Sequence, residues 1–429
     1  MKRIWIFGLA CLGVAIIVGV LWMQRASSSD RADLERELAI ASKEGLPVTW
    51  QEYASTIKPA KPTENAAPIY RKIGPLVNSK IDLSTVLADV NLRPSASTRK
   101  VVESTLRTEH RTVDLIDQAA AKPRCWFDRD WSKGLAVLMP EYARIKGGIR
   151  LVLLRGAMKA SEGEDVAAVQ DAREVIAVAR HVGEEDTAIA ALVQLSIYAL
   201  ATHQLAIWAY EHPSNPVYRK ALIECATTWP KTDLHRIHRS DMIEIREVLR
   251  LSTTKEGRRE LGLHEEDVPF TERFIPIVVS RPKADIVIAR EMRRIWEAYG
   301  EAPSERIRKA DESWQRMLPA LAAYPVGADI YLKLSDQDET GHSSAMFDLL
   351  QESRRLSYLA FARALGGQRI PKAVKLDDLK SPFTSHPLEY AFDGRQVTIT
   401  VDCHDPKIDV RPLKVPSDSE LHPNRFPGR

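Results

Sequence analysis

The chain of 429 residues is 44% hydrophobic and 28% charged, which is typical of a globular protein rather than a disordered one. Its formal net charge of +3 comes entirely from the first 25 residues, which carry Lys2, Arg3 and Arg25 and no acidic side chain. Without these three, the 61 basic residues are equal in number to the 58 acidic ones, so the basic surplus of a typical nucleic-acid-binding protein is missing. We therefore expect no nucleic-acid partner.

The first apolar segment, Ile4–Met23, carries no charge and would be about 30 Å long as a helix, the thickness of a bilayer core. Basic residues precede it, and Trp5 and Trp22 lie near its ends, where interfacial side chains are found. We predict that residues 4–23 form an uncleaved signal-anchor, with a cytoplasmic N-terminus and the body of the protein on the far side of the membrane. Two alternatives remain open, a cleaved signal peptide and a lipoprotein signal ending at Cys11.

Capping residues, prolines and apolar periodicity predict a series of helices after the anchor. Their expected bounds, in chain order, are residues 30–44, 63–70, 95–121, 140–160, 165–182, 187–211, 216–229, 233–251, 283–299, 304–321 and 342–365. Short connections between the long helices imply antiparallel neighbours. We therefore divide the chain into an anchor over residues 1–25, a juxtamembrane helix and linker over 26–62, and a helical domain over 63–367.

The segment Thr187–Tyr210 also lacks charged side chains, and Glu184–Asp186 precede it, where a helix dipole favours acidic residues. A helix that is apolar on nearly every side is buried on every side, so we predict that this one is the central helix of the domain. We accordingly expect any ligand to bind elsewhere. The alternative is a second transmembrane span, which Gln194 and the run Thr202–Gln204 make costly in lipid.

The last part of the chain changes from helical to alternating periodicity around the Asp-Gly pair at positions 393 and 394, a strong hairpin signal. A two-residue turn there pairs Tyr390 with Val397. It also pairs Leu388 with Ile399, and all four side chains share one face. We expect this β-hairpin, within residues 368–404, to pack on the helices, and the Pro-rich tail over 405–429 to be extended or disordered. Together these features predict a mainly α fold: antiparallel helical hairpins around a buried central helix, with a small C-terminal β-hairpin and an N-terminal transmembrane helix.

Three segments together resemble a group of uncharacterised, membrane-anchored, mainly helical envelope proteins of bacteria. They are Pro62–Tyr70, the stretch from Cys125 to Leu205, and Ser381–Tyr390. In that group the third segment usually has Asp and Gly where this chain has Ser381 and Ser385. The group has no assigned activity, so the resemblance implies an architecture and an envelope location but no catalytic residues.

A candidate metal-binding cluster consists of His235, His238 and Asp241, which are three residues apart and would share one face of a helix. Two histidines and a carboxylate can bind zinc or iron. However, the His-Glu-x-x-His pattern is absent, and Arg236 and Arg239 add positive charge beside the cluster. A solvated helix face is the competing interpretation, and we expect no metal or other cofactor.

Aromatic residues gather at Trp126, Phe127 and Trp131, in a segment that also contains acidic side chains. They could form a ligand-binding platform, which makes them the candidate binding residues of the sequence. The competing interpretation is a loop whose aromatic rings pack on the helical core.

Two further patterns are weaker indications of a functional site. The run Asp402, Cys403, His404 and Asp405 puts a thiol beside an imidazole, but neighbours on a strand point to opposite faces, so they do not pair easily. His203 within the apolar helix fits a hydrogen-bonded core histidine. We therefore assign no catalytic residue.

Outside the first segment the chain has three cysteines, Cys125, Cys225 and Cys403. An odd number at wide spacing is no disulfide framework, although one bridge could form in an oxidising compartment. We expect buried free thiols.

The sequence therefore favours a single-pass membrane protein whose helical body binds or scaffolds another component of the cell envelope, without catalysis. The alternative is an envelope hydrolase or metalloenzyme that uses the His235/His238 cluster. The ligand, the partner and the oligomeric state do not follow from the sequence.

Overall fold

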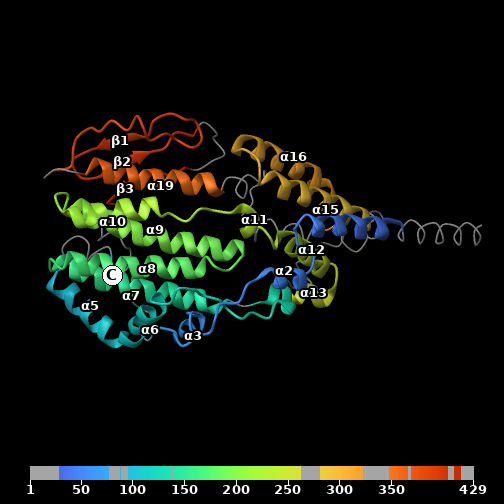
Figure 1. Ribbon diagram of the computed structural model, residues 1–429, viewed down its shortest axis with the longest axis horizontal. Coiled ribbons are helices and arrows are strands. Elements are labelled where there is room, and N and C mark those ends of the chain that lie inside the picture. The colour runs from blue at the N-terminus through green and yellow to red at the C-terminus, as the bar shows by residue number, and fades with distance from the viewer. Residues whose placement is uncertain are drawn as a thin grey trace, which may run out of the picture. The chain divides into compact units, whose positions relative to one another are not determined.

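The computed structural model describes residues 29–76, 87, 95–137, 139–261, 281–321, 324, 347–365, 369–403 and 410–416. Within these ranges the protein is mainly helical, as predicted, with one three-stranded antiparallel sheet near the C-terminus (Figure 1). The predicted transmembrane segment, residues 4–23, lies outside the described residues.

The chain forms two compact units, each made of segments that are distant in sequence. Unit 1 comprises Met1–Ile57, Asp130–Val137 and His238–Met346. Unit 2 comprises Lys58–Arg129, Leu138–Ile237 and Phe347–Arg429. The helices predicted as one domain over residues 63–367 are therefore distributed over both units.

Three long helices joined by short turns form the centre of unit 2: α7 (Pro140–Ser161), α8 (Asp165–Val182) and α9 (Ala188–Glu211). Their bounds agree closely with the predicted ones. Pro140 lies in the first turn of α7, where no amide donor is needed, and the Thr187 hydroxyl accepts a hydrogen bond from Ala190 N to cap α9.

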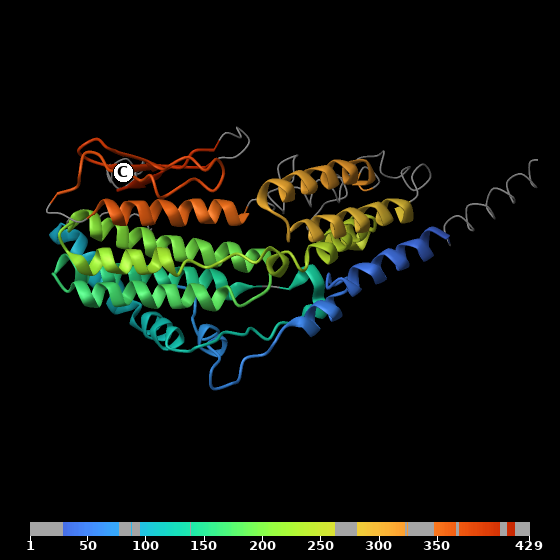
Figure 2. The same cartoon turned by 45° about the horizontal axis from the view of Figure 1, so that its top comes forward.

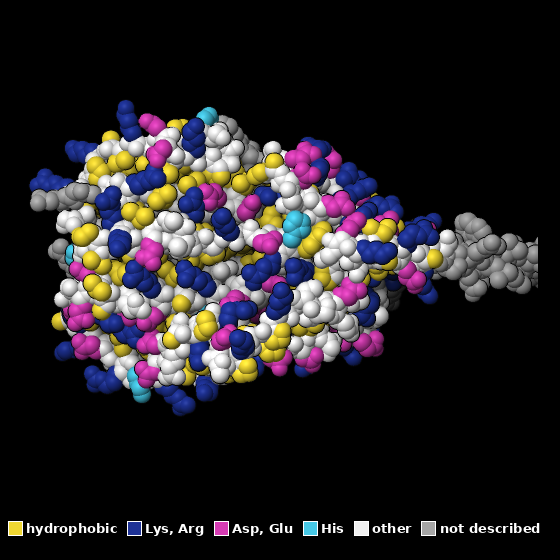
Figure 3. All heavy atoms as spheres, in the orientation of Figure 1, with side chains coloured by type: hydrophobic (Ala, Val, Ile, Leu, Met, Phe, Trp, Pro, Cys, Tyr) yellow, Lys and Arg dark blue, Asp and Glu magenta, His cyan; other side chains and the backbone are white. Residues whose placement is uncertain are grey.

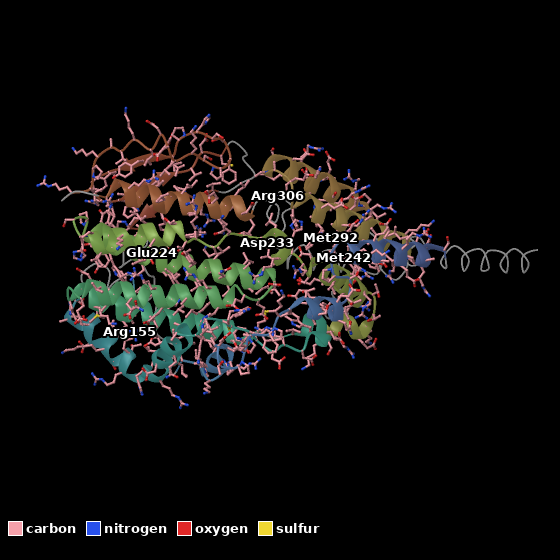
Figure 4. All side chains as sticks on the ribbon, viewed as in Figure 1. Arg155, Glu224, Asp233, Met242, Met292 and Arg306 are labelled. Atoms are coloured by element: carbon pink, nitrogen blue, oxygen red, sulfur yellow. The ribbon has the colours of Figure 1, made fainter. Side chains whose placement is uncertain are left out.

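Arg155 of α7 holds the neighbouring helices together (Figure 4). Its guanidinium donates to Asp117 at 2.7 Å, to Asp171 at 2.8 Å and to Glu174 at 3.0 Å. Because these carboxylates belong to α6 and α8, one side chain joins three helices, and Asp171, which is 1% exposed, has the charged partner that its burial requires.

Other helices and the sheet cover this centre. They are α3 (Ala67–Tyr70), α5 (Ala96–Thr108), α6 (His110–Ala120), α10 (Pro216–Thr227), α11 (Leu234–Ile237) and α19 (Phe347–Ala364). Figure 2 shows unit 2 as layers, from the sheet through α19 and the central helices to α5 and α6. The predicted single helix over residues 95–121 is wrong, because the chain breaks at Glu109 between α5 and α6.

The sheet confirms the predicted hairpin but not its register. Strand β1 (Glu389–Phe392) pairs with β2 (Val397–Thr400) so that Tyr390 lies opposite Ile399 rather than Val397. The register differs because the connection is four residues long: the Asp393 carboxylate accepts hydrogen bonds from the amides of Arg395 and Gln396. A shift of two residues keeps each side chain on its predicted face.

A third strand, β3 (Leu413–Val415), pairs with β2. This part of the predicted tail is extended, as expected, but it belongs to the sheet, which the sequence did not indicate. Val415, Val397 and Ile399 are fully buried. The strand lies between Pro412 and Pro416, and prolines are tolerated there because β3 is an edge strand.

Unit 1 begins with a helix over residues 29–43, close to the predicted one, and Gly45 follows it at φ +86°. The other helices among the described residues of unit 1 are α2 (Trp50–Thr56), the 3-10 helix η1 (Trp131–Ala136), α12 (Asp241–Ser252), α13 (Lys255–Glu260), α15 (Arg281–Ala298) and α16 (Pro303–Leu321). Met242 and Met292, labelled in Figure 4, are buried residues of α12 and α15. Glu37 of the first helix accepts a hydrogen bond from Arg290 at 2.7 Å, which holds that helix on α15.

Among the described residues, α9 is the one helix long and apolar enough to cross a membrane by length and composition. Half of its most apolar window is buried inside the protein. Thirteen of its residues are buried, from Ala190 to Ala209. The prediction that α9 is buried on every side is nevertheless wrong for its first half, where Ile189 is 57% exposed and Leu192 is 56% exposed.

Candidate functional site

The predicted aromatic platform is divided between the two units. Phe127, 4% exposed, packs in unit 2 against Tyr70, with ring centroids 6.3 Å apart. Trp131, 8% exposed, belongs to unit 1, where it stacks on Trp50 at a centroid distance of 5.9 Å and an interplanar angle of 10°. The two rings are thus built into separate cores, as the competing interpretation of the sequence expected.

Trp126 is held through its backbone by Asn65. The Asn65 amide accepts a hydrogen bond from Trp126 N at 2.8 Å and donates one to Trp126 O at 2.9 Å. Ala66 N also donates to Arg124 O at 2.9 Å. The segments Pro62–Tyr70 and Cys125–Leu205 therefore contact each other, and the role of Asn65 is to position a loop.

A buried ion network lies beneath this loop. The Arg129 side chain, 3% exposed, donates to both oxygens of Glu185, one of them at 3.0 Å, and to Glu141 at 3.3 Å. Its guanidinium lies over the rings of Phe127 and Tyr142, 4.8 and 5.5 Å from their centroids. Burial disfavours the charged form of Arg129, but the carboxylates outweigh it and raise its pKa.

The acidic residues before α9 prove to be arginine partners. Glu184 accepts from Arg124 at 2.7 Å, Glu185 pairs with Arg129, and Asp186 pairs with Arg236. The expectation that they serve the helix dipole is thus incomplete, because each one ties a different segment of unit 2 to the turn between α8 and α9.

Beside this network, His181 lies in a fully satisfied hydrogen-bonding environment. Its Nδ1 is 2.8 Å from the Tyr70 hydroxyl, and its Nε2 is 2.8 Å from Lys122 O. Because a carbonyl only accepts, Nε2 carries the proton and Nδ1 accepts from Tyr70. Burial lowers the pKa of His181 and raises that of the nearby Cys125 thiol, so both groups are held neutral and Cys125 is a poor nucleophile.

The candidate metal-binding residues His235, His238 and Asp241 do not share one helix face, contrary to the prediction from the sequence. The expected helix over residues 233–251 is wrong, because α11 ends at Ile237 and α12 begins at Asp241. His235 thus belongs to unit 2, whereas His238 and Asp241 belong to unit 1 and pair with each other at 2.8 Å. In the described part of the chain, no group of three or more His, Cys, Asp or Glu side chains could hold a metal ion.

The remaining sequence candidates show structural roles. The Asp402 carboxylate pairs with His386 Nδ1 at 2.7 Å, and its carbonyl accepts from the Ser381 hydroxyl at 2.6 Å. His404 and Asp405 lie outside the described residues. His203 is half-buried in α9. Among the described cysteines, Cys125 and Cys225 are buried thiols outside any disulfide, as expected, and Cys403 is half-buried and likewise not in a disulfide.

The feature that the sequence did not indicate is an apolar face on the first half of α9. We define the α9 strip as Ile189, Leu192, Val193, Ser196 and Leu200. These residues follow helical spacing on one side of α9; Ile189, Leu192 and Ser196 are exposed, and the other two are half-buried. No sequence signal could have selected this face, because α9 is apolar all round.

Acidic and basic side chains are interspersed over the face of the described residues in Figure 3, without a region of a single sign. The picture agrees with the neutral charge balance of the chain beyond its first residues.

Comparison with known proteins gives no relative: no family model, no curated protein and no solved structure matches the chain. The fold itself places the chain among mainly helical proteins, with two compact units and a small C-terminal sheet.

Proposed function

We propose that the protein is a single-pass membrane-anchored component of the bacterial cell envelope, whose periplasmic helical body binds another envelope protein through the α9 strip. It acts as a binding or scaffolding protein without catalysis. The anchor is the apolar segment Ile4–Met23, and the positive charge before it sets the orientation.

The α9 strip is the observation that carries the proposal. Four large hydrophobic side chains are exposed among the described residues: Val101, Val166, Ile189 and Leu192. Single exposed apolar residues are common, but Ile189 and Leu192 lie one turn apart on the same helix. A contiguous apolar face is typical of a protein–protein contact, and an amphipathic helix of the partner would complement it.

The same face of α9 is covered by this chain nearer its C-terminus. Ile207 is 1% exposed, and the Tyr210 hydroxyl donates to Arg395 O of the hairpin at 2.6 Å. The strip is therefore the uncovered part of a face that already packs against another element. A partner would extend this packing toward the N-terminal end of α9.

Three measurements on the full-length chain in its own membranes test the proposal. Carbonate extraction and protease access from the periplasmic side test the anchor and the orientation; release by carbonate would contradict both. The double variant I189D/L192D tests the strip, because buried carboxylates would disrupt an apolar contact. We expect it to lose a crosslinked partner that the matched control V166D, with an exposed residue of α8, retains. Equal crosslinking in both variants would contradict the assignment.

A further inference from the structure

One face of α12 in unit 1 carries three carboxylates. Asp241, Glu244 and Glu247 are three residues apart, so their side chains share that face. None of them is fully exposed: the Asp241 side chain is 15% exposed, that of Glu247 is 19% exposed, and Glu244 is partly buried. Like charges so close together repel each other unless neighbouring groups compensate them.

Two segments that are distant in sequence cover this face. Trp50 of α2 donates a hydrogen bond from Nε1 to Glu247 Oε2 at 2.6 Å, and its ring stacks on Trp131 of η1. Gly134 of η1 lies so close that a Cβ there would clash with the carboxylate of Glu247. The contact between α12 and the α2–η1 pair is therefore made directly on acidic groups.

A histidine lies beside Asp241, at the other end of the acidic face of α12. His238, 7% exposed, pairs through Nδ1 with Asp241 at 2.8 Å, and its ring lies 5.2 Å from that of Tyr299. Its Nε2 is buried and has no hydrogen-bond partner. The Ser240 hydroxyl donates to Glu244 at 2.5 Å. Glu244 thus receives one hydroxyl, whereas an ionised carboxylate in a partly buried position needs more donors or a cation.

The charges around Glu244 favour its protonated form. Burial is the largest effect and raises the pKa of Glu244 to about 7 together with the negative charges of Asp241 and Glu247. The hydrogen bond from Ser240 and the charge of His238 lower this pKa and so oppose the shift.

The other elements packed on α12 direct their charged groups to other partners. Arg258 of α13 donates to Ser252 O, and Asp285 of α15 acts on Arg246. Asp130 and Lys133, at η1, pair with each other at 3.6 Å. On α12 itself, Arg250 lies 3.8 Å from Glu247 and offsets part of the charge of that carboxylate.

We propose that the covered face of α12 is a proton-operated latch, in which uptake of one proton at Glu244 fastens α2 and η1 onto α12 and its loss loosens them. Protonation removes the repulsion with Asp241 and Glu247 and leaves Trp50 bonded to Glu247. A glutamate has a pKa near 4.3 in an unfolded chain, so the folded unit binds more protons between about pH 4.3 and pH 7. The latch is fully closed below this window and is lost as the pH rises through about 7.

Hydrogen exchange of the full-length chain, corrected for the intrinsic pH dependence, tests the latch at pH 5.5 and pH 8.5. We expect the amides of α2 and η1 to exchange about tenfold faster at the higher pH, and the difference to disappear in E244Q, which mimics the protonated group. D241N should shift the midpoint to lower pH, which provides a second variant if E244Q does not fold. E305Q, at an exposed carboxylate of α16, is the control and should behave as the unmodified chain. A pH dependence that persists in E244Q, or its absence in the unmodified chain, would overturn the proposal.

Discussion

Arg129 and Glu185 form a buried pair that fixes the loop before Asp130 to the turn before α9. The Arg129 guanidinium donates to both oxygens of Glu185, and the side chains are 3% and 9% exposed. The chain passes from unit 2 to unit 1 directly after Arg129. This pair therefore secures the chain in unit 2 at the point where it leaves that unit.

Replacing Arg129 with Met should destabilise unit 2 by about 3–5 kcal/mol, because Glu185 would remain buried without its cation, whereas Glu141 would keep its pair with Arg71. Thermal unfolding of the full chain in detergent measures the change. R308M, at an exposed ion pair of α16, is the matched control and should leave the stability nearly unchanged, because solvent screens such a pair. Equal losses for the two variants would show that the buried network contributes nothing particular to stability.

His181 should make unit 2 less stable in mild acid. Burial lowers its pKa in the folded protein, so the unfolded chain binds the proton more readily. The stability is fully present above the unfolded value of about 6.5 and falls as the pH drops through the window between the two pKa values. H181Q keeps hydrogen-bonding capacity without titrating, so its unfolding should lose this pH dependence; an unchanged profile would exclude His181 as the source.

Ser385 has φ +62°, a left-handed conformation that favours glycine. Glycine at this position should stabilise the protein by about 0.5–1 kcal/mol, because the strain of about 1–2 kcal/mol is removed and part of the gain is lost to the greater freedom of the unfolded chain. Chemical denaturation measures the difference between S385G and the unmodified chain. S214G, at an exposed loop residue without positive φ, should instead lower stability.

Gly134 should not tolerate a side chain. Its φ is +55°, and a Cβ would meet the Glu247 carboxylate. G134A should therefore destabilise unit 1 by about 1–3 kcal/mol through backbone strain, with displacement of Glu247 in addition. G74A is the control, since nothing lies within 4 Å of that position. Similar melting temperatures for both variants would argue that η1 can shift without cost.

The long helices could be predicted from the sequence because their caps, prolines and periodicity are local signals. Pro140 and Thr187 begin helices at the expected places. The helix breaks at Glu109 and at residues 238–240 contain no proline or glycine, so no local signal predicts them. Tertiary contacts determine where these helices end. Strand β3 has three residues and exists only because β2 is beside it.

The candidate sites were harder to predict, because their partners are distant in sequence. Arg129 lies between two aspartates, so the local sequence indicates a solvent-exposed side chain. In the structure its side chain is buried against Glu185, which is 56 positions away. The exposed face of α9 had no signal at all, since polarity does not vary around the helix. Exposure of Ile189 and Leu192 depends on where the neighbouring elements end.

Site-specific photocrosslinking tests the proposed function most directly. A photoreactive residue at position 192 of the full-length protein, irradiated in intact cells, should yield an adduct with one envelope protein, and I189D in the same chain should abolish it. The same residue at position 166, exposed on α8, should give no such adduct. Identical adducts from both positions, or none from position 192 in cells where the protein is correctly inserted, would contradict a binding role for the α9 strip.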